Sequence, residues 1–418
     1  MIVRLLYTLL LLLASPLLLM SLYKKKPGKP SIGKRWKEHF GLTPEITSQR
    51  PLWVHAVSVG EVIAATPLIK ALKQSNPSLP IVVTTTTSTG AEQVEKLGDL
   101  VEHRYMPIDF CFAVRGFLKA VKPQKMVIIE TELWPNTLYC VAKSGVPITV
   151  VNARLSEKSR QNYQRVQPVF NLVHPSLTQI LCQSQADADR FSQLGVEPNK
   201  LHVTGSIKFD IQVADQVRQQ SQQLRQQLGV KRPIWIAAST HKGEDEQVLE
   251  AHQALLKRSP EALLILVPRH PERFDAMYQL CITQGFNTQR RTQNGAHDIN
   301  SDCQVYLGDT MGEMLLLLGA ADVCFMGGSL LGDKVGGHNL LEPTAINMPS
   351  ITGPSYYNFK QITEELLELG VVSVINNANE LALALETQLA EPQDDIIAKA
   401  KQFMERNSGA LQRTLEWL

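Results

Sequence analysis

The sequence predicts an α/β protein with two doubly wound domains and an N-terminal transmembrane helix. At 418 residues the chain is too long for one ordinary core. Short runs rich in Val and Ile alternate with helical patterns in two successive blocks, which is typical of parallel sheets covered by helices on both faces. Residues 5–22 hold no side chain that is charged at neutral pH, and a segment of this length meets the lower limit for a membrane span.

A cluster of basic residues follows this apolar segment and predicts its orientation. The positive-inside rule favours a single-pass anchor over residues 1–23, with the N-terminus outside and the body of the protein in the cytoplasm. We expect the segment 24–50 to lie against anionic headgroups. The alternative is a cleaved signal peptide, which would need small residues where a Lys triplet stands. The basic residues are Lys24, Lys25, Lys26, Lys29, Lys34, Arg35 and Lys37.

Strand and helix patterns divide the body of the chain. We predict a first domain over 51–209 and a second over 232–395, because a Gln-rich stretch at 210–231 interrupts the alternation and is interpreted as a linker that holds a helix. Residues 396–418 are expected to form a C-terminal helix. Helical patterns in the first domain include 62–72, 110–120 and 186–194. The expected strands are 52–57, 81–85, 126–129, 148–151 and 179–182, and then 234–238, 263–267, 304–306, 323–326, 350–352 and 371–374.

Composition and missing motifs exclude several functions. The net charge of +2 gives no sign of nucleic-acid binding. The six cysteines are scattered, so we expect reduced, buried thiols in a cytosolic compartment. There is no Walker A motif, no H-E-x-x-H and no zinc spacing, so no metal or cofactor is expected. Asp187 and Asp189 resemble a metal-binding acidic pair, but residues two apart diverge around a helix, so we expect a solvated first turn.

A glycine-rich stretch in the second domain is the strongest candidate for a ligand site. The expected strand 323–326 runs into the pairs 327–328 and 336–337, and Asn339 and Glu342 follow at the start of a helical pattern. Glycines let a backbone approach a ligand closely, and a helix N-terminus favours an anion. The alternative is a loop that only turns the chain. The Asn-x-x-Glu spacing favours a nucleotide site.

Four charged residues of the first domain are candidates for a site: three acids that follow expected strands and a lysine at the domain junction. Glu61 opens a helix, where the helix dipole alone would favour an acid; the functional interpretation is a general base. Glu130 and Glu132 would lie on the same side of an extended chain, although Glu132 could instead be a first-turn acid before Pro135. Lys208 is either a surface residue or a cation that meets a phosphate.

Two motifs of the second domain could bind a phosphate. Arg269 stands between two prolines after an expected strand, where a guanidinium could make bidentate contacts. The run 240–244 also follows a strand and could line the same face. The run 309–313 precedes a helical pattern whose free N–H groups could accept a phosphate.

Taken together, these motifs resemble those of the 3-deoxy-D-manno-octulosonic acid (Kdo) transferases of lipid A biosynthesis. The resemblance rests on S-V-G-E at 58–61, E-T-E-L-W-P-N at 130–136, G-S-x-K-F-D at 205–210, P-R-H-P-E-R-F at 268–274, G-D-T-M-G-E at 308–313 and G-G-H-N-x-x-E-P at 336–343. It covers nearly the whole chain in the same order. It implies a Gram-negative bacterial enzyme with two Rossmann-like domains (the GT-B architecture), CMP-Kdo as donor and the lipid A precursor, lipid IVA, as acceptor.

The resemblance also implies roles for individual residues. Glu61 matches the family's base, while Glu130 and Lys208 match its presumed transition-state stabilisers. Leu340 stands where the family more often has Pro, which we expect to matter little because Leu can hold helical dihedrals. The implied CMP contacts are Pro268, Arg269, Thr310, Met311, Gly312, Glu313, Gly336, Gly337, His338, Asn339, Leu340, Leu341 and Glu342.

The implied reaction agrees with the chemistry of these residues. A CMP-sugar carries one phosphodiester, whose departure Arg269, Lys208 and a helix N-terminus could assist without a metal. A base without a protein nucleophile predicts inversion. A lipid acceptor in the cytoplasmic leaflet of the inner membrane accounts for the anchor and the basic segment. The competing hypotheses are a UDP-sugar enzyme acting on a lipid and a non-catalytic, membrane-tethered nucleotide-binding protein.

Overall fold

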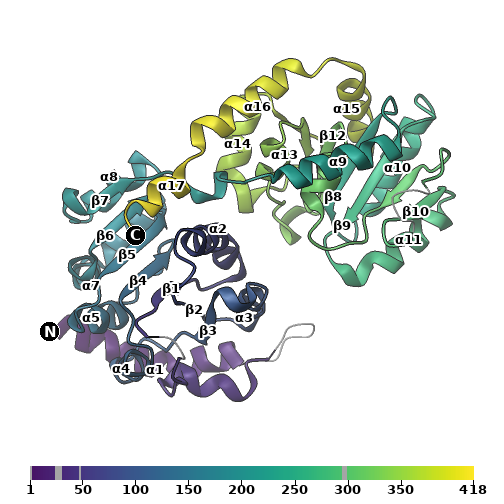
Figure 1. Cartoon of the computed structure of the whole chain (residues 1–418). Coiled ribbons are helices and arrows are strands. Elements are labelled where there is room, and N and C mark those ends of the chain that lie inside the picture. Colours follow the sequence, from purple (N-terminus) through teal and green to yellow (C-terminus); the bar gives the residue numbers. More distant parts are fainter. Residues whose placement is uncertain (1, 24–30, 47–48, 294–298) are drawn as a thin grey trace. The chain divides into compact units, whose positions relative to one another are not determined.

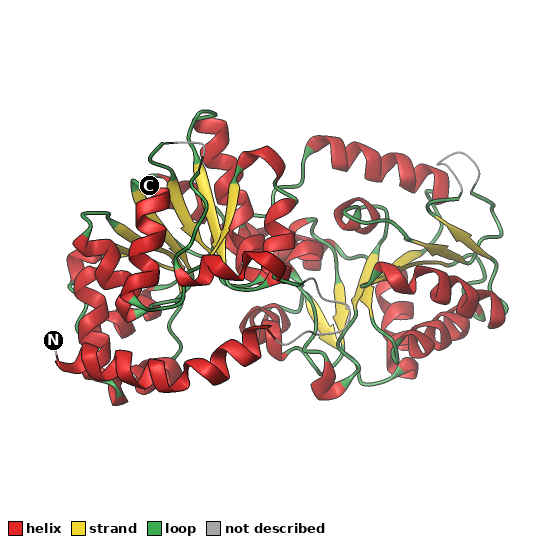
Figure 2. Cartoon of the chain, turned by 90° about the horizontal axis from the view of Figure 1, so that it is seen from below, coloured by secondary structure: helices red, strands yellow, loops and turns green. Residues whose placement is uncertain are grey.

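A computed structural model describes residues 2–23, 31–46, 49–293 and 299–418 (Figure 1). The chain divides into two compact units, one made of 1–210 with 407–418 and the other of 211–406. Each unit is an α/β domain in which helices enclose the sheet (Figure 2). Part of the predicted basic segment, namely Lys24, Lys25, Lys26 and Lys29, lies outside the described residues.

The first unit is built on a parallel sheet which, over the described residues, has seven strands in the order β3-β2-β1-β4-β5-β6-β7. Both faces are buried: Trp53 and Ile128 belong to the core on one face, and Val54 and Val127 to the core on the other. The strand order reverses between β1 and β4. The strands are β1 (Leu52–His55), β2 (Ile81–Thr85), β3 (Glu102–Tyr105), β4 (Lys125–Ile129), β5 (Ile148–Ala153), β6 (Gln179–Cys182) and β7 (Leu201–Val203).

The first unit also contains helices, most of which connect these strands. They are α1 (Ile2–Tyr23), η1 (Gly33–Phe40), α2 (Val59–Ser75), α3 (Ser88–Glu95), η2 (Gly98–Leu100), α4 (Cys111–Val121), α5 (Pro135–Lys143), α6 (Glu157–Arg165), α7 (Gln167–Val173), η3 (His174–Ser176), α8 (Gln185–Gln193), η4 (Pro198–Lys200), η5 (Ile207–Phe209) and α17 (Ala410–Leu415).

Among the described residues, α1 is the one helix long and apolar enough to cross a membrane. It nevertheless runs along the first unit (purple in Figure 1). Near its start, the Tyr7 hydroxyl donates to Asp109 Oδ2 at 2.8 Å, and at its end Tyr23 packs against Ile32 and Tyr105. Both ends therefore contact the same unit, a docked position that the sequence did not predict.

The second unit repeats this architecture. Its parallel sheet has seven strands within the described ranges, in the order β10-β11-β9-β8-β12-β13-β14, and the order reverses between β8 and β12. The strands are β8 (Ile234–Thr240), β9 (Leu263–Pro268), β10 (Thr288–Arg290), β11 (Val305–Leu307), β12 (Val323–Met326), β13 (Ser350–Thr352) and β14 (Val372–Val374). The helices are α9 (Asp215–Leu228), α10 (Asp245–Leu256), η6 (Pro271–Arg273), α11 (Phe274–Thr283), α12 (Met314–Leu318), η7 (Gly332–Lys334), α13 (Leu341–Ala345), η8 (Tyr357–Phe359), α14 (Lys360–Glu368), α15 (Ala378–Ala390) and α16 (Asp394–Asn407).

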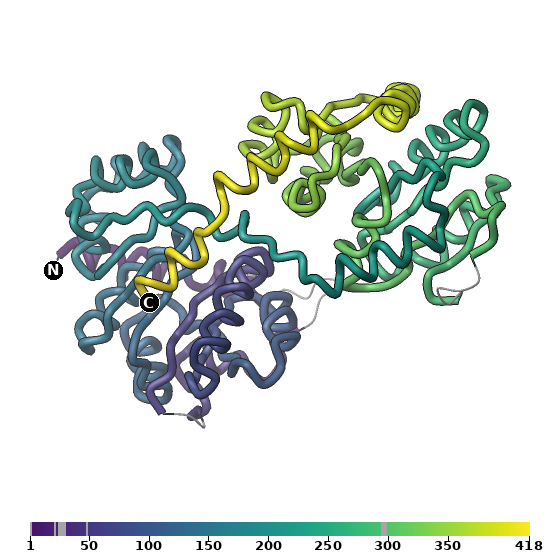
Figure 3. The backbone as a smooth tube through the Cα atoms, turned by 45° about the horizontal axis from the view of Figure 1, so that its top comes forward, coloured from purple at the N-terminus to yellow at the C-terminus, as the bar shows by residue number. Residues whose placement is uncertain are grey.

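The segments between and after the units differ from the predicted linker and C-terminal helix. Residues 210–231 contain α9, which belongs to the second unit because the Ser221 hydroxyl donates to the Leu316 carbonyl at 3.0 Å. The segment 396–418 forms two helices, since Gly409 has a φ of 83° and breaks the pattern. The second of them, α17, returns to the first unit and contacts α2 (Figure 3).

Candidate active site

Glu61, the candidate base, lies in the first turn of α2, directly after β1. The Ser58 hydroxyl caps this helix by accepting the Glu61 N–H, and it donates to Glu61 Oε1 at 2.9 Å. Glu61 Oε2 accepts the Val57 N–H at 2.7 Å. The S-V-G-E motif thus resembles a capping box, except that Glu61 reaches back to the N–H of Val57 and not to that of the N-cap Ser58. These bonds account for its residue types without a ligand and fix the carboxylate at the edge of the sheet.

Burial changes the acidity of this carboxyl group. Glu61 is only 8% exposed. Burial raises its pKa to about 6; hydrogen bonds from Val57 and Ser58 lower the pKa, and the charges of Glu132 and Glu130 raise it. A carboxylate with a pKa near neutrality is mostly ionised at pH 7 and still accepts a proton readily, as a general base must. The capping role and a catalytic role are therefore compatible.

Glu130 and Lys208 form an ion pair at the same edge. Lys208 Nζ lies 2.8 Å from Glu130 Oε1, and both side chains are partly exposed. Glu130 follows β4, the neighbour of β1, and its φ of 61° is left-handed. Such a backbone costs about 1–3 kcal/mol in a non-glycine residue and is concentrated at functional sites. The structure thus gathers Glu61, Glu130 and Lys208 where the strand order reverses, which is where sheets of this kind bind ligands.

Two neighbours of these residues have supporting positions. Glu132 precedes α5 rather than opening it, and accepts the Trp134 indole N–H at 3.1 Å. Asn152, which sequence analysis missed, accepts the Ile207 N–H at 3.2 Å and so holds the backbone beside Lys208. Its φ is 57°, and Asn tolerates this region better than most residues. An Asn at the end of an apolar run was the only signal in the sequence.

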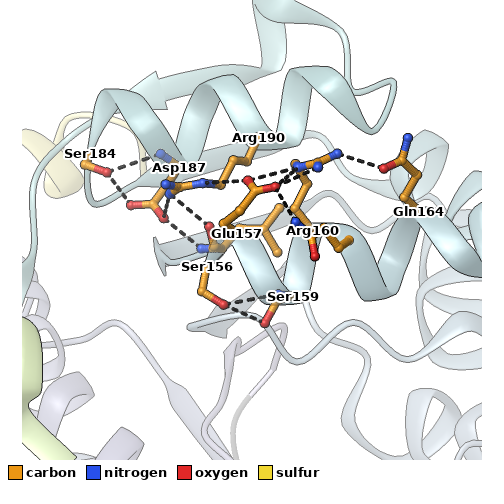
Figure 4. Close-up of polar contacts among 10 residues, drawn as sticks. Ser156, Glu157, Ser159, Arg160, Gln164, Ser184, Asp187 and Arg190 are labelled. Atoms are coloured by element: carbon orange, nitrogen blue, oxygen red, sulfur yellow. Dashed lines mark hydrogen bonds and ion pairs between the residues drawn. The ribbon is translucent and has the colours of Figure 1, made fainter.

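The acidic residues at 187 and 189 have structural roles. They do diverge, as predicted, but the expected solvated turn is wrong for Asp187, which is buried. Its carboxylate accepts the Leu155 N–H at 2.8 Å and the Ser184 hydroxyl at 2.5 Å (Figure 4). Arg190 Nη1 lies 3.7 Å from the same carboxylate. Asp187 therefore anchors the start of α8.

The implied CMP contacts gather at the carboxyl edge of the second sheet. Pro268 ends β9, Thr310 follows β11, and the stretch 336–342 follows β12. These strands are close neighbours around β8, and the carboxyl ends of parallel strands share one edge. The strand order reverses between β8 and β12, so this edge is also the expected ligand position of its unit. Three motifs far apart in the sequence are thereby brought together.

The Arg269 side chain is exposed at this edge, while its backbone N–H donates to the Thr240 carbonyl at 3.0 Å. Burial raises the pKa of Glu342, and the charge of Arg269 lowers it. The same charge lowers the pKa values of His241 and His338. The guanidinium thus lies near these three side chains and is accessible to an anionic ligand.

Three histidines lie together at this edge, and only His338 was predicted as a CMP contact. The Nε2 atoms of His241 and His338 are 2.8 Å apart, and the His270 ring meets that of His241 edge-on at 5.3 Å. Burial lowers the pKa of His241 to about 4 and that of His338 to about 3, so both are neutral at pH 7. A neutral imidazole can donate one N–H to a phosphate or carboxylate. The run 240–244 after a strand was the available signal for His241.

The glycine pairs are explained by packing within the protein. A Cβ at Gly336 would lie 2.4 Å from the Tyr357 ring, and one at Gly327 would lie 2.8 Å from Glu244 Oε1. Glu244, which ends the predicted run 240–244, is buried and accepts the N–H groups of Gly328 and His241, so it ties together the loops after β8 and β12. The close approach that predicted a ligand is thus made by neighbouring loops of the same unit.

The remaining implied contacts are partly occupied by internal bonds. Glu313 accepts two hydrogen bonds from Arg291, at 3.1 and 3.0 Å, and one from the Thr310 hydroxyl. Met311 and Gly312 are exposed between them. The helix expected after this motif, α12, spans only Met314–Leu318.

At the start of α13, the Asn339 side chain accepts the Leu341 N–H at 3.1 Å. The side chains of Leu340 and Leu341 are buried in the core, so only their backbone could meet CMP. Leu340 has φ −74° and ψ −9°, which confirms that Leu holds helical dihedrals at this position.

The sequence similarity to known proteins points to one family. The family model described as 3-Deoxy-D-manno-octulosonic-acid transferase (kdotransferase) matches residues 34–211. The chain is 40% identical to a 3-deoxy-D-manno-octulosonic acid transferase of Haemophilus influenzae, over 99% of this chain and 98% of that protein. It is 35% identical to one of Bordetella pertussis, over 88% and 86%.

Solved structures of similar proteins support the fold. The C-terminal CMP-Kdo binding domain of WaaA from Acinetobacter baumannii is 37% identical, covers 46% of this chain and 100% of its own, and has a TM-score of 0.43. A putative UDP-N-acetylglucosamine 2-epimerase from Listeria monocytogenes is 14% identical over 88% of this chain and 95% of its own, with a TM-score of 0.53. The latter likeness shows the fold alone, and it agrees with the two Rossmann-like domains predicted for a GT-B architecture. The identity across almost the entire length shows that this chain belongs to the 3-deoxy-D-manno-octulosonic acid transferase family, and it is therefore a glycosyltransferase of lipopolysaccharide biosynthesis.

Proposed function

We propose that the chain transfers Kdo from CMP-Kdo to lipid IVA with inversion and without a metal. Glu61 takes the proton of the attacking hydroxyl, the new bond forms between that oxygen and the anomeric carbon, and the bond from that carbon to the phosphate oxygen breaks to release CMP. The observation that carries this proposal is the buried Glu61 carboxylate, whose pKa is raised to about 6, beside the Glu130–Lys208 ion pair.

The first unit would bind the acceptor and the second the CMP moiety. Arg269 provides an exposed cation for the phosphate, and His338, Thr310 and Glu342 lie at the same edge of their sheet. A positive charge that is already in place stabilises the leaving phosphate without reorganisation. Lys208 could offset the charge that develops at the reacting centre, while Glu130 holds its ammonium group in position.

We also infer that α1 holds the enzyme in the bacterial inner membrane, with its catalytic body on the cytoplasmic side. The leucines of α1 are largely exposed, and Lys34, Arg35 and Lys37 follow in and around η1. The leucines would be stabilised by contact with the lipid hydrocarbon, and the basic residues by anionic headgroups.

Glu61→Gln tests the proposal directly. Loss of the base should lower turnover by about 10²–10⁴-fold, while CMP should bind as before, because the second unit is untouched. Purified protein, CMP-Kdo and tetra-acylated precursor are incubated, and the product is followed by mass spectrometry. Glu92→Gln, an exposed residue of α3, is the matched control and should keep full turnover. Near-normal turnover of Glu61→Gln would exclude its role as base, and transfer from a UDP-sugar instead of CMP-Kdo would exclude the donor.

A further inference from the structure

An apolar groove runs between α1 and the body of the first unit. It has a volume of about 550 Å³. One wall is α1, and the other is formed by η1 and by the segment from β3 into α4. The lining residues are Leu5, Thr8, Leu9, Leu12, Ser15, Leu19, Phe40, Ile108, Phe110 and Phe112.

The two polar side chains in this lining are internally satisfied. The Thr8 hydroxyl donates to the Arg4 carbonyl at 2.9 Å, and the Ser15 hydroxyl donates to the Leu12 carbonyl at 2.8 Å. These hydroxyl hydrogens are therefore not offered to a polar ligand. The groove suits a hydrocarbon and would hold water poorly.

The groove is open rather than sealed. Leu9 is 53% exposed, Leu12 57% and Phe112 60%, and these side chains come from both walls. Large apolar side chains left this open usually mark a binding surface. Phe40, at the end of η1, adds an aromatic ring from the helix that also carries Lys34 and Lys37. Hydrocarbon and anionic groups would thus be favoured side by side, as in a charged lipid.

The position of the groove links it to the candidate base. Ile108 and Phe110 follow β3 and therefore lie at the carboxyl edge of the sheet, which also carries Glu61 and Glu130. Between them, Asp109 accepts the N–H groups of Asn136 and Thr137 at 3.1 and 2.6 Å. Those residues open α5, directly after the 130–134 loop. The groove wall is thus bonded to the start of α5, the helix that directly follows the loop carrying Glu130.

We propose that this groove binds a fatty-acyl chain of the lipid acceptor, with α1 as one of its walls. The inference rests on the proposed function. It assigns α1 a role in acceptor recognition beyond attachment to the membrane. A phospholipid of the surrounding bilayer would need no link to the catalytic edge, so the acceptor is the occupant that the position favours.

Matched polar substitutions test the groove. Leu12 lines the groove and Leu13 does not, although both residues are exposed on α1. Replacing either residue by Asn makes α1 less apolar to the same extent. Phe112→Asn tests the other wall without altering α1. For acylated acceptor in detergent we expect kcat/KM to fall roughly tenfold for Leu12→Asn and Phe112→Asn, and to stay within about twofold for Leu13→Asn. With an acceptor stripped of its acyl chains, all three variants should match the unchanged protein. Equal losses for Leu12→Asn and Leu13→Asn, or losses that persist with the deacylated acceptor, would overturn the proposal.

A binding experiment separates this inference from the proposed reaction. An acceptor carrying a diazirine in one acyl chain is photolysed with the full-length protein, and the labelled peptides are identified by mass spectrometry. We expect label within 5–19 and 108–112, displaced by unlabelled acceptor and reduced in Phe112→Asn. This readout needs no turnover, so it stands even if the transfer assay fails. Label confined to other segments, or a diazirine phospholipid that labels the groove and is not displaced by acceptor, would show that the groove does not hold the acceptor.

Discussion

Glu61 is held by its own helix cap before any substrate binds, and the same contacts set its acidity. Since burial raises its pKa to about 6, the base form is lost as the pH falls through that value. We expect kcat/KM to fall about tenfold per pH unit below the pKa and to level off above it. Ser58→Ala removes a hydrogen bond that lowers the pKa, so the acid limb should move to higher pH. Glu132→Gln removes a neighbouring negative charge, so the limb should move to lower pH.

Opposite shifts of the pH–rate profile in these two variants would identify Glu61 as the titrating group. Shifts in the same direction, or none, would assign the acid limb to another group. Structural roles alone would change the rate at all pH values together. Loss of the helix cap would lower the folding stability by about 1 kcal/mol at every pH. The pH dependence therefore separates a change in the pKa of Glu61 from damage to the cap.

The charged residues of the candidate site were predicted from the sequence, whereas the glycines near the second candidate site have a different explanation in the structure. Glu130 and Lys208 were named from two motifs and prove to be bonded to each other. The glycine pairs were interpreted as room for a ligand, whereas side chains and backbone of the same unit fill that room. A sequence records that a Cβ is absent but not which atoms approach, so packing and ligand binding cannot be separated at this scale.

At the scale of elements, α5 depends on a residue outside it. Its N-cap Trp134 offers no side-chain cap, and the buried Asp109 carboxylate accepts the first free N–H groups instead. Asp109→Ala should therefore lower the free energy of unfolding by about 2–3 kcal/mol. Urea titration measures this loss. Asp99→Ala, at an exposed position of the same unit, should be neutral, and an equally stable Asp109→Ala would show that the cap is dispensable.

The strands that sequence analysis missed share one property. β3, β7 and β10 each lie at an edge of their sheet, where one side of the strand has no partner strand among the described residues. Edge strands are short and carry polar residues, as in Glu102–Tyr105 and Thr288–Arg290, so they lack the apolar run by which central strands are recognised. Strands at 81–85, 179–182, 323–326 and 350–352 were predicted with their observed bounds.

For the whole molecule, buried histidines predict weakness toward acid. His55 in the first unit and His252 in the second are fully buried, and burial lowers the pKa of each to about 4 from 6.5. The unfolded chain takes up protons between these values and the folded chain does not, so stability falls as the pH drops from 6.5 toward 4. Each histidine should lower the free energy of unfolding by about 2 kcal/mol at pH 5 relative to pH 7.5.

His252 also permits a local test, because its Nδ1 accepts the Trp235 indole N–H at 3.1 Å. Protonation at Nδ1 would remove this acceptor. Urea unfolding followed by tryptophan fluorescence at both pH values should show that His252→Gln loses less stability on acidification than the unchanged protein. Gln253→Ala, at an exposed position of the same helix, is the matched control and should keep the pH dependence of the unchanged protein. An unchanged pH dependence in His252→Gln would show that other groups control acid unfolding.

The two α/β units were predictable because each repeats the alternation of strands and helices, yet their boundaries were not. The sequence of α9 is polar enough to resemble a linker, and only its contact with α12 assigns it to the second unit. The C-terminal segment has continuous helical character on either side of Gly409, and its division between units depends on tertiary contacts. Local patterns do not encode such contacts.

The return of the last residues to the first unit has a consequence for how the protein is made. Ala410 and Leu411 complete a core with Ile207 and Leu68, and the Asp210 carboxylate accepts the N–H groups of Gly409 and Leu411. The first unit therefore cannot complete its core until residues 407–418 have been synthesised. The second unit, 211–406, is one continuous piece of chain, so its fold needs no segment from elsewhere in the sequence.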